Sequence, residues 1–343
     1  EPWTDNYKPE ILPRGEWVPH NPRAKSNYHS YRINSLYSPF LSWPEIIEMF
    51  LEAKDKPAEL QSFINVYLGE TWKEQGAMTP RLERLIELRQ PYKSGTVPSD
   101  VIISTLGVDV QQGQRDKDGL PARLECELLG HARDGRTFSI GYYIIKGEID
   151  NPYAGAWAKL KNIISAGDFP RQPDLICIDS SFKPEVVYEF CQGSNSIHPV
   201  QGADRIDGKM LFREYALKNY GGLLRYDLAV GMYKDQLYQR LSVRPESDGF
   251  CPPGFQAFPS DYPDSYFDQL TSEEKISIKR SGQIVGYRYA KKSAGRRNEA
   301  LDCRVYCMAA LDILAWRVCQ LAGLKSTDAD IFWKWAEMTH PQK

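Results

Sequence analysis

The sequence has 343 residues, of which 42% are hydrophobic and 26% charged, as in globular proteins with one large domain or two smaller ones. Its net charge of −2 argues against a uniformly basic surface for nucleic acid, although a local basic patch is compatible with it. No apolar run approaches the length of a transmembrane helix, and the first residues, EPWTDN, resemble no signal peptide, so we interpret the chain as a piece of a longer protein. Seven cysteines without a CxxC pair or zinc spacing predict reduced core residues of a cytosolic protein.

The N-terminal part of the chain is expected to form an arm followed by helices. Five prolines lie among polar residues in the first 27 positions, which predicts an extended arm. Residues 41–54, LSWPEIIEMFLEAK, predict one helix and residues 57–72 a second. One face of the first helix carries Ile46, Ile47, Phe50 and Leu51. Residues 74–100 are polar and contain three further prolines, so they are interpreted as a linker.

A different pattern begins at residue 101 and predicts a mixed sheet. Residues 101–110, 122–132 and 137–147 are apolar or alternating runs separated by short turns, including the hairpin signal RDG, which predicts three antiparallel strands. Helical and strand patterns then alternate over 154–203. Crossover helices add parallel strands beside the first three, so the expected fold class is α/β, with helices on both faces of the sheet.

The region after residue 203 is harder to interpret. Its candidate elements are a strand at 223–231, helices at 232–242 and 261–273, a hairpin at 275–292 and a long helix at 297–323. The long helix is apolar around much of its circumference, which predicts that it is well buried. No pattern assigns a role to residues 203–274.

Three aspartates far apart in the sequence are predicted to meet at one edge of the sheet. Asp109 ends the first strand, Asp179 ends the strand DLICIDSS, and Asp302 lies in the first turns of the long helix. The first and fourth strands are natural neighbours, and a helix across their ends brings the third acid to the same point. Carboxylates this close repel one another, and Mg²⁺ or Mn²⁺ relieves that repulsion. Two such ions, about 3.5–4 Å apart, can clamp the attacking and leaving oxygens of a phosphodiester.

Each acid also has an ordinary explanation. Asp179 could start a helix, Asp302 could stabilise a helix N-terminus, and Asp109 could end a strand in a loop. Taken together, the three favour a metal site. Glu299 lies three residues before Asp302 on the same helix face and is either an auxiliary ligand or general base, or a first-turn acid that complements the helix dipole after an Asn298 cap.

A basic stretch at 279–297 contains no acidic residue and has Tyr287 and Tyr289 interleaved. Its basic residues are Lys279, Arg280, Arg288, Lys291, Lys292, Arg296 and Arg297. Charged residues also protect exposed hairpin edges from aggregation. Their position directly before Asp302 nevertheless favours contact with a DNA backbone, and with no base-reading motif little sequence specificity is expected.

Four segments together resemble the large terminase subunit of lambda-type tailed phages. They are INSLYSPFLSWPEI at 33–46, FINVYLGETW at 63–72, GVDVQ at 107–111 and RNEALDCRVYCMAALDIL at 297–314, within a likeness that runs from about residue 13 to 323. The resemblance implies an RNase H-like nuclease whose acidic residues fall on Asp109, Asp179 and Asp302. Our hypothesis is that Asp109 bridges two ions while Asp179 and Asp302 each complete the shell of one. The implied reaction is endonucleolytic cutting of double-stranded concatemeric DNA during genome packaging in the host cell cytoplasm.

Large terminase subunits also carry an ATPase domain, but this sequence contains no GxxxxGK[ST] phosphate-binding loop. We therefore expect a nuclease portion without an ATP site. Its expected parts are an arm and linker from the ATPase side at 1–100, the nuclease domain at 101–325 with an insertion and basic hairpin at 203–297, and a tail at 326–343. The implied partners are double-stranded DNA, the ATPase domain of the same subunit, the small terminase subunit and the portal protein, with no membrane. The alternatives are another RNase H-like nuclease or recombinase, and a non-catalytic DNA-gripping or docking module.

Overall fold

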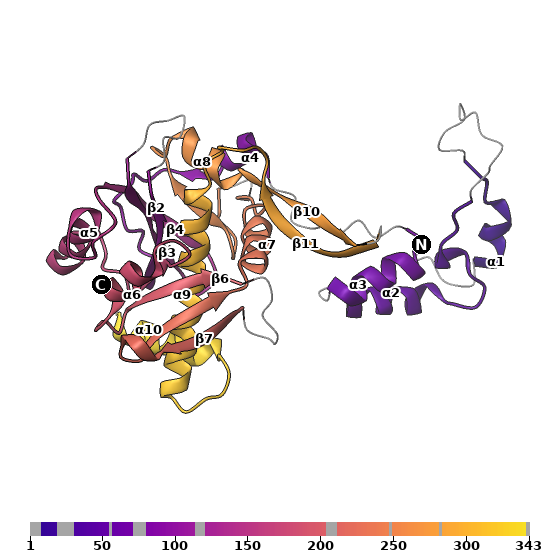
Figure 1. Ribbon diagram of the computed structural model, residues 1–343. Coiled ribbons are helices and arrows are strands. Elements are labelled where there is room, and N and C mark those ends of the chain that lie inside the picture. The colour runs from indigo at the N-terminus through magenta and orange to yellow at the C-terminus, as the bar shows by residue number, and fades with distance from the viewer. Residues whose placement is uncertain are drawn as a thin grey trace. The chain divides into compact units, whose positions relative to one another are not determined.

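The computed structural model divides the chain into two compact units, Glu1–Gly76 and Ala77–Lys343 (Figure 1). It describes residues 8–18, 31–54, 57–70, 80–113, 121–203, 211–246, 249–280 and 283–340. The sequence suggested a boundary at residue 100, whereas the structure places it before Ala77. Leu85 and Leu88, in the stretch expected to be a linker, are fully buried in the core of the second unit, because apolar residues too few to form a recognisable pattern still anchor this segment.

The first unit is helical. Its described elements are α1 (Lys8–Ile11), η2 (Leu12–Arg14), η3 (Ser35–Tyr37), α2 (Trp43–Ala53) and α3 (Pro57–Val66). Both predicted helices are therefore present, while residues 8–14 of the expected extended arm form short helical turns. Ser42 begins α2 with a capping box, since its hydroxyl oxygen accepts a 3.3 Å hydrogen bond from the backbone N–H of Glu45 and its own N–H donates to the Glu45 carboxylate at 2.7 Å.

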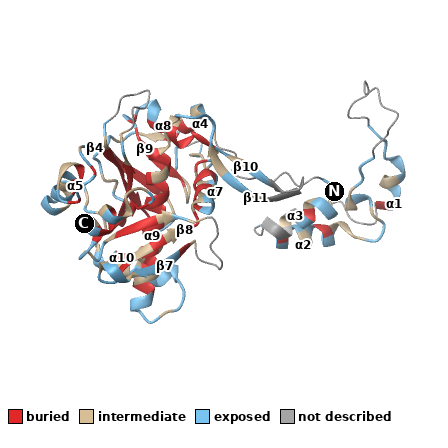
Figure 2. Cartoon of the chain, in the orientation of Figure 1, coloured by how far each residue is buried: buried red, intermediate tan, exposed pale blue. Residues whose placement is uncertain are grey.

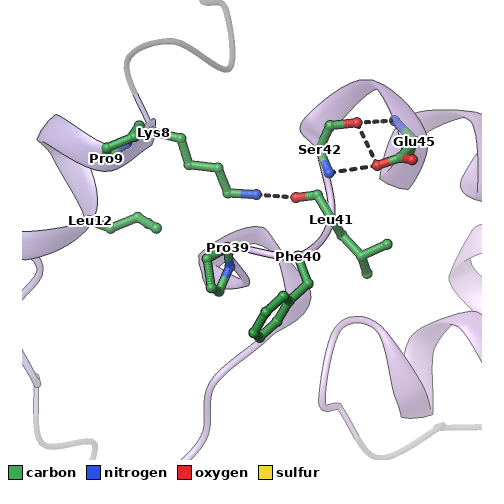
Figure 3. Close-up of a pocket in the computed structure, with 8 residues that line it drawn as sticks. All are labelled: Lys8, Pro9, Leu12, Pro39, Phe40, Leu41, Ser42 and Glu45. Atoms are coloured by element: carbon green, nitrogen blue, oxygen red, sulfur yellow. Dashed lines mark hydrogen bonds between the residues drawn. The ribbon is translucent and has the colours of Figure 1, made fainter.

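A pocket of about 430 Å³ lies on this unit beside the start of α2, and Figure 3 shows the residues that line it. The Lys8 side chain donates to the carbonyl of Leu41, which joins the N-terminal turn to the segment before α2. The apolar face predicted for α2 is only partly buried: Ile46 is 3% exposed, whereas Ile47 and Leu51 are 56% and 52% exposed. The unit thus has a small described core and an extensive exposed apolar surface.

The second unit is built on a mixed sheet. The strands that the structure describes there are β1 (Arg89–Gln90), β2 (Ile103–Gln111), β3 (Arg123–His131), β4 (Thr137–Lys146), β5 (Leu175–Asp179), β6 (Ile197–Gly202), β7 (Phe212–Leu217), β8 (Leu223–Leu228) and β9 (Gln256–Pro259). Their order is β1-β9-β4-β3-β2-β5-β6-β8-β7. β2, β3 and β4 are antiparallel, and β5 and β6 continue parallel to β2. The predicted fold class is confirmed.

Helices cover both faces of this sheet (Figure 1). On one face lie α5 (Gly155–Ala166) and α6 (Pro184–Cys191), and on the other lie α7 (Val230–Arg240), α8 (Asp264–Leu270) and α9 (Glu299–Leu321). Figure 2 shows that buried residues concentrate in the central strands and in α9. The long buried helix expected from the sequence is α9, which packs on β2, β3 and β5.

Alternation along the central strands divides their side chains between the two faces. On β2, Leu106, Val108 and Val110 join the core under α5 and α6. On β5, Ile176 and Ile178 join the same core, while Leu175 and Cys177 join the core under α9. Asp109 and Asp179 occupy the alternate positions, so the period of two places both acids on the face that α9 covers.

The second unit also contains α4 (Leu82–Ile86), the 3-10 helix η4 (Lys218–Tyr220), the hairpin of β10 (Glu273–Arg280) and β11 (Gln283–Lys291), and α10 (Ala329–Thr339). The predicted hairpin projects from the sheet as a separate two-stranded ribbon (Figure 1). Residues 326–343, expected as a tail, include α10, whose Phe332 and Ala336 are buried.

The predictions about cysteines and membrane spans can also be compared with the structure. The seven cysteines are all free, and every one except Cys251 is buried, as expected for reduced core residues. Within the described ranges, no helix is both long and apolar enough to traverse a bilayer.

Candidate functional site

A pocket of about 470 Å³ lies at the end of β2 and β5 and the start of α9. Its lining residues are Asp109, Val110, Gln111, Gln112, Gly113, Arg123, Asp179, Phe182, Lys291, Gly295, Arg296, Arg297, Glu299 and Asp302. All three predicted aspartates are among them, together with Glu299 and the last basic residues before α9. Residues nearly 200 positions apart in the sequence therefore contribute to one polar cavity.

Strand pairing places Asp109 and Asp179 side by side. β2 and β5 run parallel, and Val108 is in register with Ile178, so the next residue on each strand is one of the two aspartates. Both side chains are largely withdrawn from solvent, with Asp109 4% and Asp179 8% exposed. Asp179 does not start α6, because that helix begins at Pro184 after Lys183 as its N-cap.

Close approach of α9 to β2 brings in Asp302. A Cβ atom at Gly107 would lie 2.0 Å from the carbonyl oxygen of Cys303, so only glycine allows the strand and helix backbones to come this near. Asp302 immediately precedes this contact and lies in the first turn of α9. The "GVDVQ" and "ALDC" segments of the sequence are thus complementary parts of one contact.

Each of the three carboxylates accepts hydrogen bonds from nearby residues, and the Asn298 amide donates to Asp302 at 2.7 Å. The Gln111 amide donates to Asp109 at 2.5 Å. Ser181 donates to Oδ1 of Asp179 from its hydroxyl at 2.8 Å and from its backbone N–H at 3.0 Å. In the part of the chain that the structure describes, no three His, Cys, Asp or Glu side chains are grouped tightly enough to hold one metal ion. The acids share a pocket, but their carboxylates are engaged with these neighbours.

The electrostatics of the pocket favour protons or cations. Burial raises the pKa of Asp109 well above its usual value, and the charges of Asp302 and Asp179 raise it further. Burial also raises the pKa of Asp179, against hydrogen bonds from Ser181 that lower it. Burial raises the pKa of Asp302 although nearby Lys234 opposes this. The three aspartates therefore bring negative charge together where water solvates it poorly, although basic side chains also line the pocket.

Glu299 takes part in a chain of ion pairs at the pocket wall. Its two carboxylate oxygens face Arg123 Nη2 at 3.5 Å and Arg297 Nε at 3.1 Å. Glu125 links the same two guanidinium groups, with contacts of 2.5 Å to each. Asn298 is the N-cap residue, as expected, but its side chain makes no capping hydrogen bond. Glu299 is thus held by arginines in a network that also contains Tyr142.

Sequence reasoning missed Arg123 and Glu125, which are buried at 1% and 0% exposure. The segment RLECEL does contain a signal, because polar and apolar residues alternate along it. Alternation in a strand normally indicates a solvated polar face, and only the packing of α9 against this face turns it into a buried ion-pair network.

The basic stretch is divided between the pocket and the hairpin. Lys291, Arg296 and Arg297 line the pocket. Arg288 and Lys292 are exposed. Lys279 and Arg280 belong to β10, but their side chains lie outside the described residues. Arg296 is 3.0 Å from Asp268 and Arg297 pairs with two glutamates, so part of the positive charge is already compensated within the protein.

Comparison with known proteins links this site to a family. The chain is 29% identical over 314 residues to the terminase large subunit of Escherichia phage lambda, covering 87% of this chain and 46% of that protein. It is 27% identical over 325 residues to the terminase large subunit of Enterobacteria phage P21, covering 92% of this chain and 48% of that protein. The chain therefore spans about half the length of these curated relatives.

A solved large terminase nuclease from thermophilic phage G20c is similar over 66% of this chain and 96% of its own length, with 12% identity and a TM-score of 0.37. The family model described as "Terminase large subunit gpA, endonuclease domain" matches residues 28–321, which include all three aspartates of the pocket. This chain belongs to the family of the terminase large subunit gpA endonuclease domain.

Proposed function

We propose that this chain is a divalent-metal-dependent endonuclease that cuts double-stranded concatemeric DNA for a viral packaging motor. Family membership supports the class of activity. The observation that carries the proposal is that Asp109, Asp179 and Asp302 line one pocket, with burial and mutual repulsion raising the pKa of Asp109. Hard cations such as Mg²⁺ or Mn²⁺ prefer carboxylate oxygens, so the chemistry of this donor set suits them. To share an ion, the carboxylates would have to turn from their present hydrogen-bond partners toward one another.

Asp109, Asp179 and Asp302 would hold the ions, and two ions are the proposed complement. When bound, the ions would stabilise the negative charge that develops on the phosphodiester oxygens. Gln111 and Ser181 keep Asp109 and Asp179 oriented through the hydrogen bonds described above. Glu299 would act as an auxiliary ligand or general base, and its two arginine contacts fix its orientation.

Lys291, Arg296 and Arg297 would bring the DNA backbone to the pocket. Arg288 and Lys292 extend positive charge from the pocket along the hairpin, on exposed side chains. Lys279 and Arg280 of β10 are also proposed to contact DNA. Because phosphate contacts carry little sequence information, we propose that a partner selects the cutting site.

The packaging context comes from the relatives. We propose that the partners are the ATPase domain of the same subunit, the small terminase subunit and the portal protein, in a complex that works in the host cell cytoplasm. The lambda and P21 relatives named as terminase large subunits support this context.

The proposal is tested by incubating supercoiled plasmid with the chain and Mn²⁺. Wild type is expected to nick and linearise the plasmid, and Asp179→Ala to reduce cutting at least about 100-fold, equivalent to about 2.7 kcal/mol. Asp302→Asn is expected to abolish cutting while the protein stays folded. Asp168→Ala, an exposed aspartate just after α5, is the matched control and should cut like wild type.

Equal cutting by wild type and Asp179→Ala would remove Asp179 from the mechanism. A docking module is distinguished by calorimetry, because it would show no tight Mn²⁺ site that disappears with Asp109→Ala.

A further inference from the structure

Helix α7 lies in the region 203–274, to which the sequence assigns no role, yet it reaches the acidic pocket. Lys234 on α7 is a buried lysine, 5% exposed. Its ammonium group lies 3.0 Å from Oδ1 of Asp302 and 2.8 Å from Oε2 of Glu273, the first residue of β10. One buried cation therefore joins a proposed metal ligand to the base of the basic hairpin.

Asn298 closes this arrangement from the other side. Its amide nitrogen donates to Oδ2 of Asp302 at 2.7 Å and to Oε1 of Glu273 at 2.8 Å. The two carboxylates consequently share two donors, but Asn298 is neutral and Lys234 supplies the charge. The Lys234 ammonium group thus contacts both carboxylates directly.

Two carboxylates, those of Asp302 and Glu273, share the single positive charge of Lys234. Glu273 is 5% exposed, and its carboxylate shares donors with Asp302, so the two repel each other with little screening by water. Lys234 offsets this repulsion because it contacts both. Without the ammonium group, the side chain of Asp302 would be pushed away from Glu273 and out of the orientation it has at the pocket.

The neighbouring residue on α7 provides an internal comparison. Among the described residues, Asp235 contacts the hairpin: its carboxylate is 3.0 Å from the Lys275 ammonium on β10 and accepts a 2.6 Å hydrogen bond from Tyr289 on β11. Of these two consecutive residues of α7, Lys234 contacts the acid at the pocket, whereas Asp235 contacts the two strands of the hairpin.

We propose that Lys234 is a positioning residue that holds Asp302 in place as a metal ligand against repulsion from Glu273. The inference rests on the proposed function, because it requires Asp302 to bind an ion. The inference assigns a role to a residue of the region 203–274, which the sequence left unexplained. Lys234 is needed to keep Asp302 in place because Glu273 repels Asp302.

The test measures Mn²⁺ binding by isothermal titration calorimetry, with no DNA present, on the 343-residue chain. Lys234→Met keeps most of the length of the side chain and removes its charge, and is expected to weaken Mn²⁺ binding at least about tenfold. The double variant K234M/E273Q removes the opposing carboxylate and offers an amide to Asp302, so it should return Mn²⁺ affinity to within about threefold of wild type. Asp235→Asn is the control and should bind Mn²⁺ like wild type.

Thermal unfolding without metal is recorded for every variant, because a purely structural lysine would lower the melting temperature without rescue of Mn²⁺ binding by E273Q. Wild-type affinity in Lys234→Met, or a double variant as defective as the single one, overturns the inference and leaves the nuclease proposal intact. If Lys234→Met does not fold, Mn²⁺ binding is measured on Lys234→Arg and on K234M/E273Q instead. Loss of Mn²⁺ binding by the folded double variant then contradicts the inference. If wild type binds no Mn²⁺, the proposed function and this inference both fail.

Discussion

Glu127 on β3 and Asp109 on β2 both face helix α9, but they meet different partners there. Arg304 of α9 is 2.6 Å from Glu127, and both side chains have no exposed surface. The Arg304 guanidinium also lies 4.4 Å from the centre of the Phe258 ring, and Tyr266 donates a 2.8 Å hydrogen bond to Glu127. This acid is compensated by a cation and by a neutral donor.

Asp109 lies on β2 two residues beyond Gly107, which is in register with Glu127, and among the described residues it has no ion pair. The neighbouring acids Asp179 and Asp302 raise its pKa further instead of neutralising it. The same helix and sheet therefore contain one acid that is balanced internally and one that is not. We interpret the first as structural, and the second as the place where an external cation is required.

The largest effect on stability is expected at the balanced acid, Glu127, when its partner Arg304 is removed. Arg304→Ala leaves Glu127 buried without its cation, which should lower the free energy of unfolding by about 3–5 kcal/mol. Urea denaturation followed by circular dichroism measures the loss. The double variant E127L/R304M removes both charges and should recover most of it. A loss below about 1 kcal/mol for Arg304→Ala would show that Glu127 does not depend on Arg304 for its compensation, and the contrast with Asp109 would fail.

A smaller effect on stability is expected when Mn²⁺ or pH is changed, because both act on the uncompensated acid Asp109 and its neighbour Asp179. The pKa values of Asp109 and Asp179 are raised in the folded protein above the usual 3.8, so their contribution to stability is present below that value and is lost as pH rises through the folded values. Mn²⁺ should restore stability at neutral pH, by about 1.4 kcal/mol at ten times its Kd, and less at pH 5 where protons compete.

Thermal unfolding at pH 5 and pH 7.5, with and without Mn²⁺, measures this effect. The variant D109N/D179N should lose the Mn²⁺ stabilisation at both pH values. The same stabilisation in wild type and in this variant would place the ion elsewhere.

The smallest effect is expected on the hairpin, where charge is exposed to solvent. Arg288→Ala should weaken binding of double-stranded DNA a few-fold and reduce the slope of log affinity against log salt by about 1, because one phosphate contact is lost. Fluorescence anisotropy in Ca²⁺ at several salt concentrations measures both. Lys161→Ala, which removes an exposed charge on α5, is the matched control. An identical salt slope for the two variants would exclude Arg288 from the DNA contact.

The sequence was sufficient to predict the central strands and the pairing of Asp109 with Asp179, because long apolar runs joined by crossover helices leave few arrangements. It could also place Asp302, since a long apolar helix has to cross the sheet. It could not identify β1 and β9, which have two and four residues and no period that a pattern could reveal.

The partners of the site were equally hidden from the sequence. Lys234 and Glu273 look like solvated charges in two predicted helices, 232–242 and 261–273, whereas Glu273 in fact begins β10. Only the packing of α7 against α9 and β10 buries the two side chains together. A buried ion pair between distant segments leaves no trace in local periodicity. The sequence therefore predicted the acids that the sheet topology positions, but not the cations that tertiary packing brings to them.

Gly107 places a limit on how this site can be altered. With only hydrogen atoms on its α-carbon, the main chains of β2 and α9 are already at their minimum clearance, and any substitution there can only separate them. A substitution at Gly107 therefore offers no way to bring Asp109 and Asp302 closer together. Under the proposed function, a redesign for an ion of another radius would have to change the reach of the side chains at 109, 179 and 302, for example by exchanging aspartate for glutamate.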